Sequence, residues 1–133
     1  MLSNLYTVQG EALSGTSWEI YPRPQMRRDS YISLNGLWEL FVEDYTEPFS
    51  IQVPFCPESL LSGVNQHFPE GSVLSYKRKF QLPKGFNKGR VLLHIGAADQ
   101  KAEVFVNKKP VGRHEGGYTA FTLHITDVLE EEN

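Results

Sequence analysis

Hydrophobic and polar residues alternate in several short runs after about residue 30, as they do in β-strands that bury one face. The runs are "LNGLWELFVED", "FSIQVP", "SYKRKFQLP" and "AFTLHIT". The residues that they turn inward are Trp38, Leu40 and Val42; Phe49, Ile51 and Val53; Tyr76, Phe80 and Leu82; and Phe121, Leu123 and Ile125. Loops rich in Pro, Gly, Asn and Ser separate these runs, so the pattern predicts many short strands joined by turns.

Three features modify this picture. Arg78 falls on the apolar face of its run, as an exception to the alternation. "RVLLHIGAAD" is apolar on both sides, which predicts a central strand covered on both faces. "KAEVFVNKKPVGRHE" is typical of a hairpin, and we expect it to turn at residues 107–110.

The first part of the chain lacks a regular period. Pro22 and Pro24 favour an extended arm, which Trp18 and Tyr21 would anchor. Helical signals occur only in "PESLL" and in "VLEEEN", which Thr126 or Asp127 could cap. Many short strands with little helix favour an all-β fold, and we choose a jelly-roll β-sandwich. The predicted division is an extended N-terminal arm over residues 1–30 and a jelly-roll domain over residues 31–133.

Composition excludes several classes of partner. The chain has 133 residues, a formal net charge of −3 and one cysteine. Such a charge gives no reason to expect nucleic acid as a partner, and no apolar run reaches the roughly 18 residues of a membrane span. No secretory leader pattern is visible at Met1, so we expect a cytoplasmic domain. Cys56 lies between Phe55 and Pro57 and is expected to be buried and inert.

The ionisable residues form no recognisable catalytic or metal-binding motif. Among the 16 acidic residues, Glu39, Glu43 and Glu103 fall on outward strand positions, and Glu130–Glu132 look like a charged helix end. The four histidines show no zinc-site spacing, although a metal site assembled across strands stays open. "GRHEGGY" lacks the residues of a phosphate loop, and its glycines favour a bend. We therefore expect no catalytic residue, no metal and no cofactor.

Aromatic residues and two histidines are the remaining candidates. His67 and His114 lie in segments that look like loops, where ligand contacts concentrate. Aromatic rings in loop-like regions can stack on the apolar face of a sugar, and the alternative is that they cap the ends of the sandwich. These rings are Trp18, Tyr21, Phe68 and Tyr118. From these residues alone, the role of capping the sandwich is favoured over contact with a sugar.

Together, the ordered segments resemble the N-terminal sugar-binding domain of glycoside hydrolase family 2, the family of β-galactosidases, β-glucuronidases and β-mannosidases. They are "RPQMRRDSYISLNGLWEL", "IQVPFCPESLLSG", "YKRKFQLP" and "RVLLHIGAADQKAEVFVNKKPVGRHEGGYTAFTLHITDVL". The resemblance runs from about Tyr21 to Asn133 and implies a galactose-binding-like jelly roll. The hairpin departs from it, because Asn107-Lys108 replaces the usual Asn-Gly; we expect a longer or different turn.

The resemblance also carries expectations about the rest of the protein. In the family, this domain precedes an immunoglobulin-like sandwich and a (β/α)₈ barrel that holds both catalytic glutamates. Further strands of the jelly roll follow the segment that matches residues 116–133, so the domain is expected to be truncated at its C-terminal end. Open edges then predict a homo-oligomer. A family asparagine that reaches the sugar corresponds most nearly to Asn65 or His67.

Three functions stay open after the sequence. The leading hypothesis is a non-catalytic N-terminal domain of a retaining exo-β-glycosidase, with a β-glycoside substrate bound through the full-length enzyme and its other domains. It would support the barrel and shape the rim of its pocket. The alternatives are an independent carbohydrate-binding module and a structural oligomerisation domain. The weak candidates for carbohydrate contact are Asn65, His67, His114 and Tyr118.

Overall fold

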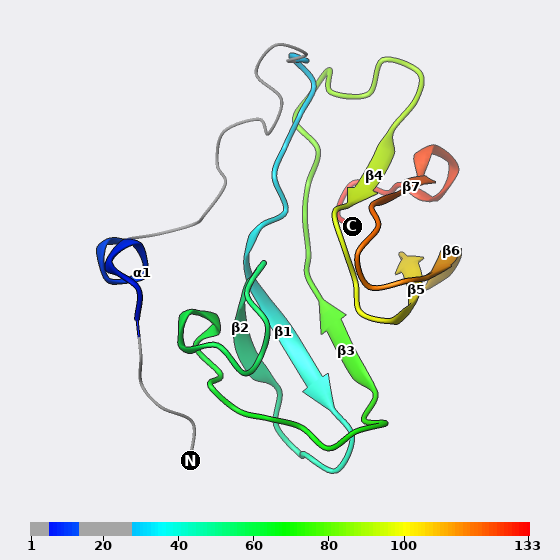
Figure 1. The fold of residues 1–133 in the computed structure, drawn as a ribbon. Helices are drawn as coiled ribbons and strands as arrows, with labels where there is room; N and C mark the ends of the chain where they lie inside the picture. The colour runs from blue at the N-terminus through cyan, green and yellow to red at the C-terminus, as the bar shows by residue number, and fades with distance from the viewer. Residues whose placement is uncertain (1–5, 14–27) are drawn as a thin grey trace. The chain divides into compact units, whose positions relative to one another are not determined.

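The computed structural model describes residues 6–13 and 28–133. The predictions for Trp18, Tyr21, Pro22 and Pro24 lie outside these residues. The elements are one short α-helix, α1 (Val8–Ala12), and the strands β1 (Gly36–Val42), β2 (Phe49–Val53), β3 (Leu74–Lys77), β4 (Leu92–Ile95), β5 (Lys101–Val106), β6 (Lys109–Glu115) and β7 (Phe121–His124) (Figure 1). Two 3-10 helices, Leu60–Ser62 and Thr126–Val128, complete the described structure. The all-β class is confirmed.

The described residues fall into two compact units, one that ends at Arg78 and one that begins at Lys79. In the first unit, β1 lies between β2 and β3 in an antiparallel sheet (Figure 1). Alternation sets its two faces as the sequence predicts: Leu40 and Ile51 are 0% exposed and Val42 is 4% exposed. Trp38, Phe49 and Val53 pack against this core from the same face. The period of two thus specifies the buried face of this sheet.

The third strand is shorter than predicted, and Arg78 follows its end. Its Nη1 donates to the carbonyl oxygens of Leu34 at 2.7 Å and Asn35 at 2.8 Å. A guanidinium at this position satisfies two backbone acceptors that precede β1, so the exception in the pattern has a structural role. β3 ends at Lys77, and Tyr76 and Phe80 belong to different units rather than to one strand face.

The second unit contains two antiparallel strand pairs, β4 with β7 and β5 with β6. Val91, Val106 and Ile125 are its buried residues, at 3–6% exposure. The partly buried residues around them are Phe80, Leu82, Phe86, Leu93, Val111, Leu123, Val128 and Leu129. The predicted inward face of the last strand is confirmed. The prediction for β4 was wrong: among the described residues β7 is its one paired strand, and its side chains are half-buried or exposed.

The hairpin β5–β6 corrects another prediction. Its loop is the two residues Asn107 and Lys108, with φ of 51° and 64°, and not a longer turn. Two consecutive left-handed residues are typical of a type I′ turn. The Asn107 side chain donates to the carbonyl oxygen of Val128 at 2.7 Å and to Asn133 Oδ1 at 2.8 Å. Contacts outside the hairpin therefore help to hold this turn.

The helical predictions are partly wrong. α1 lies within the arm that was expected to be extended, where the Thr7 hydroxyl accepts from Gly10 N–H at 3.0 Å and caps the helix. In "PESLL" the turn begins later, at Leu60. Thr126 begins a 3-10 helix that ends at Val128, and its hydroxyl accepts from Val91 N–H at 2.9 Å instead of capping. Glu130–Glu132 follow this helix and do not belong to it.

Candidate functional site

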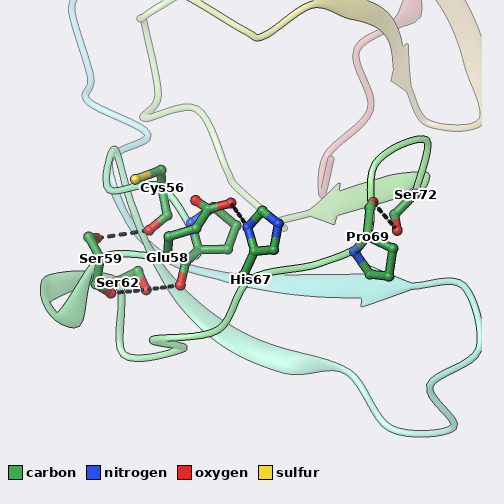
Figure 2. A network of polar contacts seen from close by, with 8 residues as sticks. Cys56, Glu58, Ser59, Ser62, His67, Pro69 and Ser72 are labelled. Atoms are coloured by element: carbon green, nitrogen blue, oxygen red, sulfur yellow. Dashed lines mark hydrogen bonds and ion pairs between the residues drawn. The ribbon is translucent and has the colours of Figure 1, made fainter. Parts of the chain in front are cut away.

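A buried serine holds together the loop between β2 and β3. Ser62 is 1% exposed, and its hydroxyl donates to the Ser59 carbonyl oxygen at 2.7 Å. The Ser62 hydroxyl oxygen itself accepts from the N–H of Val64 at 3.0 Å. Ser59 donates in turn to the carbonyl oxygen of Cys56 at 2.8 Å (Figure 2). These bonds fix the backbone that carries two of the predicted site residues.

Asn65 and His67 lie in this loop. Asn65 is half-buried with φ of 49°, a left-handed conformation that asparagine tolerates better than most residues, and its N–H lies 3.4 Å from Ser62 Oγ. The side chain of His67 is 74% exposed, and its Nδ1 lies 3.7 Å from Oε1 of Glu58 (Figure 2). A pair so exposed adds little stability, so both groups stay accessible to a polar ligand.

In this loop Phe68 has a structural role, the alternative that the sequence favours, and the prediction for Cys56 is wrong. Phe68 is 6% exposed, and its ring makes edge contacts with Tyr45 and Phe49 at centroid distances of 5.7 and 5.5 Å. It belongs to the core and cannot serve as a platform for a sugar. Cys56 is exposed rather than buried, because β2 has ended at Val53 and the neighbouring Pro57 takes the buried position.

Tyr76 lies close enough to this loop for two of its residues, Glu58 and Cys56, to change the pKa of the phenol. Its pKa is raised above the ordinary 10.0, first by burial, then by Glu58 and then by Cys56. Because all three causes disfavour the phenolate, Tyr76 stays a neutral hydrogen-bonding group. Glu58 is therefore placed near both His67 and Tyr76. This arrangement can bind a polar group, but it does not supply the two facing carboxyl groups of a glycosidase.

The second candidate region is the turn between β6 and β7. His114 lies on β6, not in a loop as predicted, and its ring stacks on Phe121 at a centroid distance of 4.3 Å. Its Nε2 is 2.9 Å from the Thr119 hydroxyl oxygen. Gly116 has φ of 124°, which fits the predicted bend. Tyr118 is fully exposed, with a relative exposure of 101%. His114 thus supports the turn, and Tyr118 presents a ring to solvent.

The four predicted contacts fall into two pairs. Asn65 and His67 share the loop of the first unit, whereas in the second unit His114 lies near the end of β6 and Tyr118 in the turn that follows it. Sequence reasoning missed Ser62 and Asp99. A small hydroxyl residue inside "LLSGVN" was the available signal for Ser62. Asp99 lies against Gly117, and a local sequence pattern cannot predict a contact between residues so far apart in the chain.

Glu39, Glu43 and Glu103 are all exposed to solvent, as predicted, although Glu43 follows the end of β1. Within residues 6–13 and 28–133, no group of three His, Cys, Asp or Glu residues could hold a metal ion. In the same part of the chain, no helix is long and apolar enough to cross a membrane.

No protein-family model matches the chain. A β-galactosidase of Thermoanaerobacter pseudethanolicus is 26% identical over 118 residues, which are 81% of this chain and 16% of that protein. A solved β-D-glucuronidase of Dictyoglomus thermophilum is 29% identical, with a TM-score of 0.59 over 75% of this chain and 18% of its own.

A solved β-D-mannosidase of Dictyoglomus thermophilum is alike in fold, with a TM-score of 0.62 and 24% identity over 74% of this chain and 14% of its own. The chain therefore spans between 14% and 18% of the length of these three proteins. The resemblance that the sequence predicts is confirmed over about three quarters of the chain, and the fold likeness agrees with the predicted all-β sandwich.

Proposed function

We propose that this chain, which resembles glycoside hydrolase family 2 in sequence and in fold, is the N-terminal non-catalytic domain of a retaining exo-β-glycosidase. Its role is to support the catalytic barrel and to shape the rim of the pocket, and the β-glycoside is bound by the full-length enzyme. The observation that carries the proposal is its match to a small part of three glycosidases.

The carboxylates of the described residues support a non-catalytic role. A retaining glycosidase places two carboxyl groups about 5 Å apart, one as acid/base and one as nucleophile. Here Glu58 faces His67 and Glu115 faces Lys101, each at 3.7 Å. Each of these two carboxylates faces a basic side chain and not a second carboxyl group, which suits a solvated surface better than a catalytic pair.

The test is hydrolysis of aryl β-glycosides by the purified chain. We expect no release of the chromogenic aglycone from a β-galactoside, a β-glucuronide or a β-mannoside. The matched positive control is the β-galactosidase of Thermoanaerobacter pseudethanolicus acting on the galactoside. Turnover by the chain that co-purifies with it and survives repurification would overturn the non-catalytic proposal.

A second candidate function is carbohydrate binding by the chain itself. The fully exposed ring of Tyr118 favours it, because an aromatic face can cover the apolar face of a pyranose. Asn65, His67 and His114 remain the other proposed contacts. Sugar-dependent NMR shifts that disappear in Tyr118→Ala would support this function, and unchanged spectra would exclude it.

The remaining parts of the proposal concern organisation. We retain the division into an arm over residues 1–30 and a jelly-roll domain over residues 31–133, which limited proteolysis can test through its first cleavage site. The protein is proposed to be cytoplasmic, where a reducing environment would preserve the exposed thiol of Cys56. We also propose that it forms a homo-oligomer through the edges of its sheets.

A further inference from the structure

We propose that the Asp99 carboxylate and the Tyr118 ring form one contact site for a neutral hexopyranose, and that Asp99 disfavours a hexuronate. This inference rests on the second function proposed above, in which the chain itself touches sugar. It adds a residue that the sequence did not suggest, and it specifies the chemical class of the sugar.

The first element of the site is a ring held out by a well-supported turn. Gly116 N–H donates to the carbonyl oxygen of Gln100 at 2.8 Å, which ties the turn to the start of β5. Thr119 is bonded to His114, whose ring stacks on Phe121. Tyr118 lies between these supports with its side chain fully exposed. A ring on such a turn loses little backbone freedom when it binds a ligand.

The second element is a carboxylate beside the same turn. A Cβ atom on Gly117 would stand 2.5 Å from Asp99 Oδ1, so the absence of a side chain at Gly117 leaves room for the carboxylate. Tyr118 is the next residue, about 3.8 Å away from Cα to Cα. Asp99 is exposed and makes no hydrogen bond or ion pair with any residue that the structure describes. Its oxygens are therefore available as acceptors.

These two groups suit a neutral sugar. The ring covers C–H groups of a pyranose, and carboxylate oxygens accept strong hydrogen bonds from hydroxyl groups. A uronate would bring a second negative charge to the same turn, and Lys101, the lysine or arginine nearest to Asp99 along the chain, already faces Glu115 at 3.7 Å. Asp99 therefore selects against an acidic sugar.

The experiment is NMR titration of the full 133-residue chain, ¹⁵N-labelled, with methyl β-D-galactopyranoside and with methyl β-D-glucuronide. We expect saturable amide shifts from the galactoside that centre on residues 98–101 and 115–120. The glucuronide should bind about tenfold more weakly at low salt. Tyr118→Ala should abolish the shifts, whereas Tyr118→Phe, which keeps the ring, should retain them.

Asp99→Asn is the decisive variant. It should weaken galactoside binding by about fivefold, because a charged acceptor is replaced by a neutral one. It should also bring the ratio of the affinities for galactoside and glucuronide close to one. Glu103→Gln makes the same change of charge on the exposed side of β5 and should leave both affinities unchanged.

Absence of localised shifts would overturn the inference, and so would a preference that Asp99→Asn leaves intact. Shifts that are equal for both sugars in the unchanged chain would also overturn it. A failure of the second function, on which this inference rests, is distinguishable, because it would appear as no sugar-dependent shift anywhere in the chain.

Discussion

At the scale of single residues, Ser62 is the buried polar group on which the loop between β2 and β3 depends. We predict that Ser62→Ala lowers the free energy of unfolding by about 1–3 kcal/mol. The reason is that the N–H of Val64 loses its acceptor, while the Ser59 carbonyl oxygen keeps only the longer bond from the Ser62 N–H at 3.2 Å. Urea denaturation followed by tryptophan fluorescence measures the loss.

Ser72 provides the matched control for this prediction. Its hydroxyl also donates to a carbonyl oxygen, that of Pro69 at 2.7 Å, but the bond is exposed to solvent (Figure 2). Ser72→Ala should therefore change stability by less than about 0.5 kcal/mol. Equal losses in the two variants would mean that burial of the Ser62 hydroxyl is not what makes it important.

Tyr76 gives a prediction about alkaline pH. Its pKa in the folded chain lies above the ordinary 10.0, chiefly because of burial and next because of Glu58. The unfolded chain therefore releases this proton first, so the contribution of Tyr76 to stability is complete below pH 10 and is lost as pH rises through the folded pKa. Between pH 10 and the folded pKa of Tyr76, the Tyr76→Phe chain should lose less stability than the unchanged chain.

The free energy of unfolding, measured against pH for the unchanged chain and for Tyr76→Phe, checks the direction of this difference. Phenolate absorbance of the folded protein gives the titration directly, and Glu58→Gln should shift that titration to lower pH because one of the opposing charges is removed. A Tyr76→Phe chain whose alkaline loss equals or exceeds that of the unchanged chain would contradict the prediction.

At the scale of elements, the sequence predicts faces better than boundaries. Leu40, Ile51 and Ile125 are buried as alternation requires, because the period of two is a local property of a strand. The end of a strand depends on distant partners instead. β3 ends at Lys77, and the side chain of the next residue, Arg78, binds carbonyl oxygens 43 and 44 positions away, which no window of sequence contains.

The same limit applies to the candidate site. The exposed position of Tyr118 follows from the glycines before it, so a local pattern finds it. Phe68 also follows a loop-like pattern, yet it is buried against aromatic rings from β2 and from the loop after β1. Asp99 reaches Gly117 across 18 positions of the chain, so its place in the site depends on the fold.

The β5–β6 turn yields a prediction that separates backbone from side-chain effects. Lys108 has φ of 64°, which glycine adopts without the steric cost that a Cβ atom brings. We predict that Lys108→Gly stabilises the chain by about 0.5–1 kcal/mol, measured by thermal or urea unfolding.

Asn107→Gly is the contrasting variant in the same turn. It brings the same relief of φ, at 51°, but removes the bonds to Val128 and Asn133. We therefore expect a net loss of stability. If both glycine variants shifted stability in the same direction and by the same amount, the side chain of Asn107 would have no role in holding the turn.

At the scale of the whole molecule, the sheets contain two or three strands each within the described residues. Small sheets are marginal on their own, and unpaired strand edges attract further strands. The edges differ in charge. β5 and β6 carry Lys101, Glu103 and Arg113, which discourage pairing, whereas "LLHI" of β4 and "FTLH" of β7 contain neither acidic nor basic residues other than histidine.

We therefore predict that the proposed homo-oligomer forms through β4 or β7 rather than through β5 or β6. His94 is exposed on β4, and His94→Lys should weaken association by placing a charge on that edge, as protective lysines do on natural edge strands. Glu103→Gln changes the net charge by the same sign on β5 and should leave association unchanged. Sedimentation velocity at micromolar concentration measures both. A monodisperse monomer of the unchanged chain would refute oligomer formation, and equal effects of the two variants would refute the assignment of the edge.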